Sequence, residues 1–374
     1  MASSSDRRIT IGIECESLEG DSWGVARMVR QLVTELAARP ELRRRLRFAL
    51  YFRRAVPADM AGLDPDVFSM RVIGVPSFSF YYFVALPLRL WFDRPAVMFW
   101  PNYMLPIIHP PYVKSLVMLT EDIYREMRNP RLGLRYRLAY RIFAAGWAAH
   151  MATRIMAISR ASAAALRRIG LHANRLVVNE LGVRPARAAP ADPGTYLLYV
   201  GQAFERRHLR ESLAAFTELA MEDPILQFRI IGPDRYDPPM IADAVRHLNH
   251  RLGRSAVSWR PQVGDDELAM AYRGARAVVY VSDEEAFGLP PIEALAYGTP
   301  AVIMDAPVTR EVFGDHAFFT PSADVGTLTA TFRRALGDRE ARARIKDAAP
   351  SILARHSWAG FADRFITVVR ALTR

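Results

Sequence analysis

The sequence has 374 residues, of which 51% are hydrophobic and 24% charged, so it can form two ordinary domains and is neither a disordered tail nor a minimal scaffold. Its one cysteine, Cys15, excludes an internal disulfide and a thiolate metal cluster, and predicts a reducing, cytoplasmic compartment. The net charge of +11 belongs to the first half, because residues 1–190 hold 28 Arg and Lys against 15 Asp and Glu, whereas residues 191–374 hold 22 against 24. A basic half favours an anionic partner, which can be nucleic acid, anionic lipid or a phosphorylated lipid carrier.

The beginning of the chain and its most apolar stretch argue against a signal peptide and against a transmembrane segment. Residues 1–10 lack the apolar core of a signal peptide, so we expect no secretion. Two prolines and three charged residues interrupt the apolar stretch 78–100, whereas a spanning helix needs about 20 apolar residues in succession. We therefore expect no transmembrane segment.

Short apolar runs alternate with amphipathic stretches of helical length in both halves, which predicts an α/β protein with two parallel sheets. The expected strands are 9–13, 47–52, 97–100, 116–119, 154–158 and 176–178 in the first half, and 196–200, 228–231, 256–259, 277–280, 301–304 and 317–319 in the second. Residues 184–194 hold three prolines and interrupt both regular structures. We therefore predict a first domain of residues 1–183, a linker of 184–194 and a second domain of 195–356, with ligands in the cleft at the carboxyl ends of the strands.

The densest motif is VSDEEAFGLPPIEALAY at 281–297, directly after the expected strand 277–280. A glycine and two prolines between 288 and 291 predict that the helix begins only at Ile292, which puts Glu293 in its first turn. The loop then leads closely spaced backbone amides into a helix N-terminus, an arrangement that attracts a phosphate or a sugar hydroxyl. Glu285 and Glu293 can face one ligand from the two ends of this loop.

This motif resembles the signature of the retaining glycosyltransferases of family 4, in which a Glu, seven residues and a second Glu surround Gly-Phe-Gly-Leu-Pro. Here Ala286 replaces the first glycine of that core. Other blocks follow in the family's order, namely Tyr199-Val200-Gly201, Arg206-Arg207-His208-Leu209, Ile230-Ile231-Gly232-Pro233, Asp266 to Ala275, Ala157 to Ser162 and Val177 to Val183. The resemblance implies the GT-B fold, with two Rossmann-like domains facing a central cleft and a terminal helix, residues 357–374, that packs back on the first domain.

The resemblance also implies that the second domain binds a nucleoside diphosphate sugar of GDP or UDP type, with no cofactor. Glu293 would accept hydrogen bonds from the ribose hydroxyls, and Glu285 would hold the donor sugar as an electrostatic group, with Glu284 as the alternative register. Arg206 and Arg207 would grip the diphosphate and stabilise its charge as it leaves. The remaining donor-binding positions would be Phe287, Gly288, Leu289, Gly201, Gly232 and Gly24.

In the first domain the resemblance points to two loops. The loop 16–24 precedes a helix expected near Val25, and family members approach the phosphate and the acceptor with a glycine there, so Gly24 comes first and Gly20 second; an ordinary turn explains the loop equally well. Glu121 follows the expected strand 116–119 at the position of a family histidine beside the transferred sugar, and Asp122 keeps the family identity. Either Glu121 takes that role with reversed charge and Asp122 supports the acceptor hydroxyl, or the site has lost activity.

Three further patterns bear on metals and partners. Asp64-Pro65-Asp66 resembles an Asp-x-Asp metal motif only superficially, and no other cluster has metal-ligand spacing, so we expect no metal. The arginines at 43–47 and 53–54, together with the aromatic stretch 78–91, suit contact with an anionic membrane, although a basic helix beside a buried core helix explains them equally well. Nucleic acid is not expected, because no reading module is present.

These features together predict a retaining, metal-independent glycosyltransferase of bacterial surface polysaccharide synthesis, lipopolysaccharide included. Its acceptor would be a glycan or a polyprenyl-diphosphate-linked glycan. Its place would be the cytoplasm, where a peripheral position on the inner face of the membrane is compatible with the sequence. The resemblance leans towards mannose as the sugar. A catalytically silent GT-B scaffold subunit and a nucleotide-sugar epimerase or phosphorylase are the alternatives.

Overall fold

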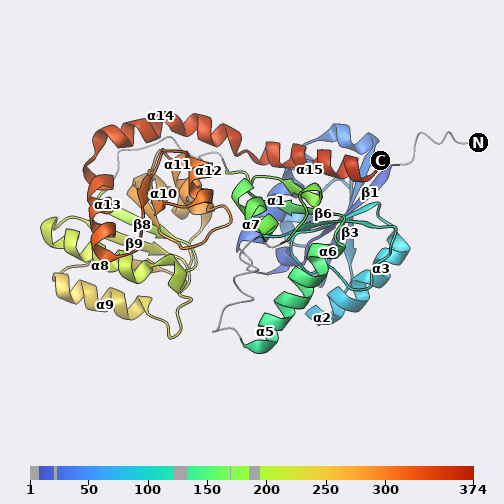
Figure 1. Cartoon of the computed structure of the whole chain (residues 1–374), viewed down its shortest axis with the longest axis horizontal. Helices are drawn as coiled ribbons and strands as arrows, with labels where there is room; N and C mark the ends of the chain where they lie inside the picture. The colour runs from blue at the N-terminus through green and yellow to red at the C-terminus, as the bar shows by residue number, and fades with distance from the viewer. Residues whose placement is uncertain (1–7, 21–22, 121–132, 169, 185–193) are drawn as a thin grey trace, which may run out of the picture. The chain divides into compact units, whose positions relative to one another are not determined.

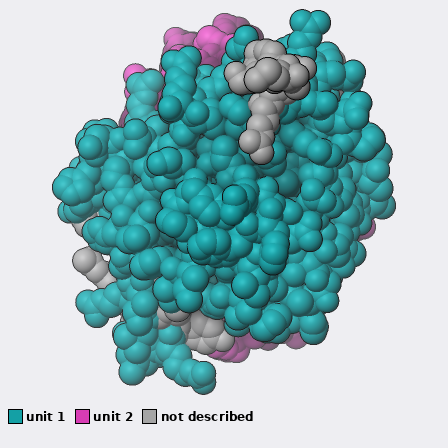
Figure 2. Space-filling view, turned by 90° about the vertical axis from the view of Figure 1, so that its right-hand side faces the viewer, with its two compact units in different colours: residues 1–182, 358–374 teal, residues 183–357 magenta. Residues whose placement is uncertain are grey.

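The computed structural model describes residues 8–20, 23–120, 133–168, 170–184 and 194–374. The chain folds into two compact units, coloured separately in Figure 2: unit 1 comprises residues 1–182 and 358–374, and unit 2 comprises residues 183–357. Each unit has one parallel sheet with helices packed against it, which confirms the predicted α/β class. Most of the expected linker, residues 185–193, lies outside the described residues.

Unit 1 is built on a seven-stranded sheet in which every neighbouring pair is parallel. Its strands, in the spatial order β3-β2-β1-β4-β5-β6-β7, are β1 (Ile9–Glu14), β2 (Leu46–Phe52), β3 (Phe68–Val72), β4 (Val97–Trp100), β5 (Lys114–Met118), β6 (Arg154–Ala157) and β7 (Leu176–Val178). Strand β3 was not among the predicted strands. This strand lies at the edge of the sheet, is mostly half-exposed and contains Ser69 and Arg71, so it lacks the apolar run of a buried strand.

The helices of unit 1 include the last helix of the chain, α15 (Trp358–Leu372), which lies against α1 (Trp23–Ala37) in Figure 1. Arg39 Nη2 lies 3.0 Å from Asp363 Oδ1, and the rings of Phe99 and Phe365 meet at 5.2 Å. The shorter helical segments are η1 (Glu16–Glu19), η2 (Pro40–Arg44), η3 (Ala58–Met60), α2 (Phe78–Phe80), η4 (Tyr81–Ala85), α3 (Leu86–Asp93), α5 (Leu134–Ala139), η5 (Tyr140–Ala148), α6 (Ala149–Met151), α7 (Arg160–Arg168) and η6 (Ala173–Arg175).

Unit 2 is built on a six-stranded parallel sheet. Its strands, in the order β10-β9-β8-β11-β12-β13, are β8 (Tyr196–Val200), β9 (Gln227–Ile231), β10 (Val257–Arg260), β11 (Ala275–Tyr280), β12 (Ala301–Met304) and β13 (Phe318–Thr320). Its helical segments are η7 (Glu205–Arg207), α8 (Leu209–Glu222), α9 (Ile241–Leu252), α10 (Asp265–Gly274), α11 (Leu289–Ala296), α12 (Pro307–Phe313), α13 (Val325–Gly337) and α14 (Arg339–Arg355). The central strand β8 is buried along its whole length, as its unbroken apolar sequence requires.

None of the helices in the described ranges has both the length and the apolar content that crossing a bilayer requires.

Candidate functional site

The candidate site lies at the carboxyl ends of three neighbouring strands of unit 2. Strand β8 pairs with β9 on one side and with β11 on the other, and all three run in the same direction. The loops that follow them therefore leave from one edge of the sheet, which is where open α/β sheets bind their ligands. These loops carry the blocks around Gly201, Gly232 and Glu285.

Two guanidinium groups converge on one carboxylate at this edge. Arg206 Nη1 lies 2.9 Å from Glu285 Oε1, and Arg207 Nε lies 3.1 Å from the same oxygen. The three side chains are only 13–24% exposed. Arg206 Nη1 also donates to Ser282 Oγ at 3.2 Å, and Arg207 Nη1 donates to the Gln202 carbonyl at 2.9 Å. The predicted diphosphate and sugar residues thus lie within hydrogen-bond distance of one another.

The charges of this cluster stabilise one another. Burial would by itself raise the pKa of Glu285, but the guanidinium groups of Arg207 and Arg206 outweigh it and hold this pKa below its usual value. Burial would likewise lower the pKa of Arg207, but Tyr280 and Glu285 raise it. These three groups therefore carry one net positive charge, with the carboxylate held between two cations.

The loop that carries Glu285 is also held by His208, a residue whose role the sequence analysis missed. His208 ends the short turn η7 in the left-handed region, with φ of 44°, and its Nε2 lies 2.6 Å from Asp283 Oδ1. The backbone N–H of Asp283 donates to the Arg206 carbonyl at 3.0 Å. The resemblance aligns His208 with a family asparagine, and Asn is enriched in this conformation, so the substitution was the only signal in the sequence.

Gly201 and Gly232, both predicted to bind the donor, meet across the ends of β8 and β9. Both have positive φ, 133° and 137°, and a Cβ added to Gly232 would lie 2.0 Å from the Gly201 carbonyl oxygen. A Cβ on Gly201 would lie 3.0 Å from Arg207 Nη1. The two glycines therefore allow the β8 loop, which carries both arginines, and the β9 loop to pass each other closely.

The Gly232→Ala variant is expected to lose about 1–3 kcal/mol of unfolding free energy, because the methyl group would have to displace the backbone of Gly201 and the residue would remain at a strained φ. Chemical denaturation measures this loss. Gly62→Ala is the matched control, since this glycine is exposed and its Cβ would meet nothing within 4 Å, and it should change stability by less than about 0.5 kcal/mol. Equal stability of the two variants would contradict the close approach.

Helix α11 begins three residues earlier than predicted, at Leu289 rather than at Ile292. The prediction was wrong because the first N–H groups of a helix have no partner within it, so Pro290 and Pro291 cost nothing there. Glu293 consequently lies in the second turn. Its Oε2 accepts a hydrogen bond from the Tyr272 hydroxyl at 3.0 Å, which holds the carboxylate in a fixed position.

The core of the motif connects Glu285 to this helix. Gly288 caps the helix with φ of 84°, a conformation that favours glycine, and Leu289 is the first helical residue. Phe287 is buried and its ring lies 5.3 Å from that of His356, edge to face. Phe287 therefore anchors the loop in the core of unit 2.

A cavity of about 550 Å³ opens beside the arginine pair. It is lined by Glu205, Arg206, His208, Arg210, Glu211, Tyr236 and Asp283. Its two arginines come from the β8 loop and the start of α8, whereas Tyr236 comes from the β9 loop. The cavity has the size for part of a nucleotide, and its three carboxylates offset the two guanidinium groups, so an anionic group fits best on the side of Arg206.

The other predicted site residues, Glu121, Asp122 and Gly24, belong to unit 1. Glu121 and Asp122 lie outside the described residues. Helix α1 begins at Trp23 instead of near Val25, because the first helical residues need no hydrogen-bond partner for their N–H groups. Gly24 is therefore the second residue of the helix; it is exposed, and a Cβ there would meet nothing within 4 Å, so the fold does not require glycine at this position.

The acidic loop before α1 is fixed by the residues that follow β2. Arg53 Nη2 lies 3.0 Å from Glu16 Oε1, and Glu19 accepts hydrogen bonds from the backbone N–H groups of Arg53 and Arg54. Asp64 pairs with Arg43 at 2.8 Å rather than with a second carboxylate. Within the described ranges no three His, Cys, Asp or Glu side chains are placed to hold a metal ion.

A buried carboxyl at the end of β1 was also missed. Glu14 is fully buried, and its Oε1 accepts hydrogen bonds from the Glu16 N–H at 2.6 Å and the Tyr81 hydroxyl at 3.4 Å. Its Oε2 has no hydrogen-bond partner among the described residues. Burial raises the pKa of Glu14 to about 8, so the group is largely protonated at neutral pH. Its place at the end of the run ITIGIE was the only sign in the sequence.

Comparison with known proteins connects the site to a family. Residues 185–351 match the family model of the group 1 glycosyl transferases. The serotype-specific mannosyltransferase WbdA of Escherichia coli is 32% identical over 132 residues, which are 35% of this chain and 16% of WbdA. The O-antigen chain mannosyltransferase B of Escherichia coli is 31% identical over 144 residues, 38% of this chain and 37% of that protein. The chain therefore spans well under half the length of these relatives.

A solved structure extends the comparison to the whole chain. The sucrose-phosphate synthase of Thermosynechococcus elongatus superposes with a TM-score of 0.73 at 19% identity, and the match covers 98% of this chain and 99% of that one. At this identity the likeness concerns the fold, which is GT-B, as the sequence resemblance implied. The segment 185–351, which carries Arg206, Arg207, Glu285 and Glu293, is similar to the group 1 glycosyl transferases, and the chain as a whole has the GT-B fold.

Proposed function

We propose that this protein is a retaining glycosyltransferase that moves a sugar, with mannose as the first candidate, from a nucleoside diphosphate donor to a glycan or a polyprenyl-diphosphate-linked acceptor. The proposal includes metal-independent transfer and a place in bacterial surface polysaccharide synthesis, at the cytoplasmic side of the membrane. The names of the two mannosyltransferase relatives support the sugar and the pathway.

The observation that carries the proposal is the convergence of Arg206 and Arg207 on Glu285 at the ends of β8 and β11. Cleavage of a sugar–phosphate bond leaves negative charge on the diphosphate and positive charge at the anomeric carbon. Two fixed guanidinium groups stabilise the first charge without a proton transfer, and a neighbouring carboxylate stabilises the second. Because the three groups are held by the protein before any ligand arrives, little reorganisation is needed during the reaction.

Other groups of unit 2 would bind the remaining parts of the donor. Glu293, held by the Tyr272 hydroxyl, offers two oxygens to the adjacent hydroxyls of a ribose. The cavity beside Arg206 and Tyr236 provides room for part of the nucleotide. Retention then follows a front-face attack in which the leaving phosphate accepts the acceptor's proton, with Glu285 as an electrostatic group rather than a nucleophile.

A two-part experiment tests the proposal. The first part measures the melting temperature with GDP, UDP, GDP-mannose and UDP-hexoses, because a ligand that binds only the native state raises it. The second part incubates the protein with the labelled sugar nucleotide that shifts it most and with undecaprenyl-diphosphate-linked saccharides, without added metal and with EDTA. We expect a melting shift with one class of nucleotide, and label transfer that EDTA does not reduce.

Other results would overturn particular parts of the proposal. A shift with no transfer and no change in the donor would indicate a silent subunit. Conversion of the donor sugar without an acceptor would indicate an epimerase. Transfer with inverted anomeric configuration would overturn the retaining mechanism, and loss of transfer in EDTA would overturn metal independence.

A further inference from the structure

The helical stretch 78–93 of unit 1, formed by α2, η4 and α3, is apolar on two opposite sides. One side, with Tyr81, Tyr82, Leu86 and Leu90, is fully buried in the core. The other side faces solvent, and its apolar residues recur every four positions; their exposed fractions are 49% for Phe80, 40% for Val84, 56% for Leu88 and 82% for Phe92. A surface helix of a water-soluble domain normally has polar residues on its outer side. This outward apolar stripe, residues 80, 84, 88 and 92, therefore indicates a surface that binds a partner.

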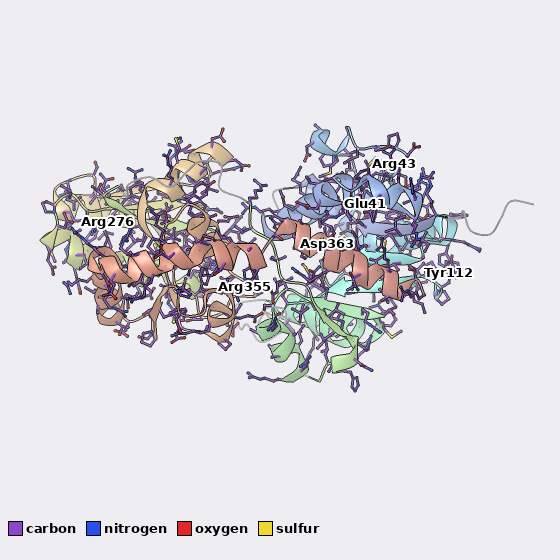
Figure 3. The ribbon with its side chains drawn as sticks, turned by 90° about the horizontal axis from the view of Figure 1, so that it is seen from above. Glu41, Arg43, Tyr112, Arg276, Arg355 and Asp363 are labelled. Atoms are coloured by element: carbon purple, nitrogen blue, oxygen red, sulfur yellow. The ribbon has the colours of Figure 1, made fainter. Side chains whose placement is uncertain are left out.

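A second stripe and a loop of unit 1 share this property. Leu134, Leu138 and Ile142, again four residues apart along α5 and η5, are 64%, 43% and 55% exposed. In the loop 107–112, Ile108 is 69% exposed and Tyr112 is 41% exposed. Tyr112 donates to the carbonyl of Trp91 at 3.1 Å and meets its ring edge to face, so this loop adjoins α3; Figure 3 shows Tyr112 at the periphery of unit 1.

The exposed apolar residues are concentrated in this part of the chain. Of the 17 large hydrophobic side chains that are exposed within the described residues, 14 lie between Val72 and Met151 in unit 1. Only Met221, Ile225 and Met270 belong to unit 2, where they are 61–64% exposed. Scattered exposed residues such as these three are ordinary, whereas a concentration of this size marks an interaction surface.

The charges of the same segments indicate what kind of partner fits. Residues 67–160 contain twelve arginines and lysines against four acidic residues, Asp93, Glu121, Asp122 and Glu126. Asp93 is itself neutralised, because Arg89 Nε lies 3.0 Å and Arg71 Nε 3.4 Å from its Oδ2. Aromatic and aliphatic groups accompanied by an excess of arginine suit the interface of an anionic bilayer, where the side chains enter the headgroup region and the cations meet lipid phosphates.

We propose that the outward stripe of residues 80–92, the loop 107–112 and the stripe 134–142, here called the apolar surface, dock unit 1 on an anionic lipid bilayer. The occupant is the bilayer surface itself, and the protein lies on it rather than crossing it. The apolar surface belongs to unit 1 alone, and its binding to lipid does not require sugar transfer, so the test below is independent of the proposed function.

The test is sedimentation of the full chain with vesicles. Vesicles of phosphatidylcholine with about one third phosphatidylglycerol are compared with phosphatidylcholine alone, at low and high salt. We expect binding to the anionic vesicles, at least about tenfold weaker binding to the neutral ones, and weakening by salt, because each nearby cation contributes to the attraction. The triple variant Phe80→Ser, Leu88→Ser, Phe92→Ser should weaken anionic binding at least about tenfold while it keeps the wild-type fold, since these side chains are exposed.

A matched control changes the same kind of residue in the other unit. Met221→Ser, Ile225→Ser, Met270→Ser removes three exposed apolar side chains from unit 2 and should leave vesicle binding unchanged. Arg135→Gln with Arg141→Gln, both exposed, should reduce the salt-sensitive part of binding. The proposal is overturned if the wild type ignores anionic vesicles or if the Phe80 variant binds as well as the control. It is equally overturned if light scattering shows a wild-type dimer that the Phe80 variant abolishes, because a second copy would then cover the surface.

Discussion

Arg207→Gln is expected to lower kcat/KM for sugar transfer by about two to three orders of magnitude, the usual cost of removing a preplaced electrostatic group. Arg207 is 13% exposed and lies 3.1 Å from Glu285, so its charge acts in a partly dehydrated site. Glutamine keeps much of the side chain's bulk but cannot neutralise a departing diphosphate. Kinetics with the donor identified by melting shift measure the effect. It should lower kcat, because further negative charge develops on the departing diphosphate, and raise KM for the donor, whose diphosphate is already charged when it binds.

Two controls separate this loss from a loss of structure. The carboxylate of Glu285 keeps Arg206 as a partner in the variant, so the unfolding free energy should fall by no more than about 3 kcal/mol. Arg246→Gln removes an arginine that is 76% exposed on α9 and should leave both kinetics and stability unchanged. If the Arg207 variant transferred sugar at the wild-type rate, the role of the arginine pair in the reaction would have to be abandoned.

Glu14→Gln is expected to abolish a loss of stability that the wild type suffers as the pH rises. The folded state raises the pKa of Glu14 from 4.5 to about 8, so folding favours the protonated carboxyl. The stabilising contribution is therefore complete below about pH 4.5 and is lost as the pH rises through about 8. Between pH 6 and pH 9 the loss amounts to about 2–3 kcal/mol, whereas the neutral amide of glutamine does not titrate.

Urea unfolding at pH 6, 7.5 and 9 measures this difference. The control is Glu41→Gln, which removes an exposed glutamate of unit 1, labelled in Figure 3, and should retain the wild-type slope with pH. Parallel pH dependences of the wild type and the Glu14 variant would show that Glu14 is ionised in the folded protein.

The strands and the signature motif were predictable because each is encoded by residues that are neighbours in the sequence. Parallel strands covered on both sides appear as unbroken apolar runs, as in β8, whereas the half-exposed edge strand β3 of unit 1 lacks such a run and was not expected. The start of α11 was misjudged for a local reason as well, since prolines at 290 and 291 interrupt a helix but are tolerated in its first turn.

The sequence by itself determined the α/β class, the two sheets and the residues of the Arg206-Arg207 and Glu285–Glu293 blocks, because composition, apolar runs and motif spacing are properties of neighbouring residues. Only the tertiary structure decided that Glu285 pairs with arginines nearly 80 residues earlier in the chain, that Gly232 needs its missing side chain because of Gly201, and that Glu14 is buried and protonated. The physical reason is the strand order. Placing β8 between β9 and β11 brings distant loops together at one edge of the sheet, and burial, which depends on every element around a residue, then sets its charge.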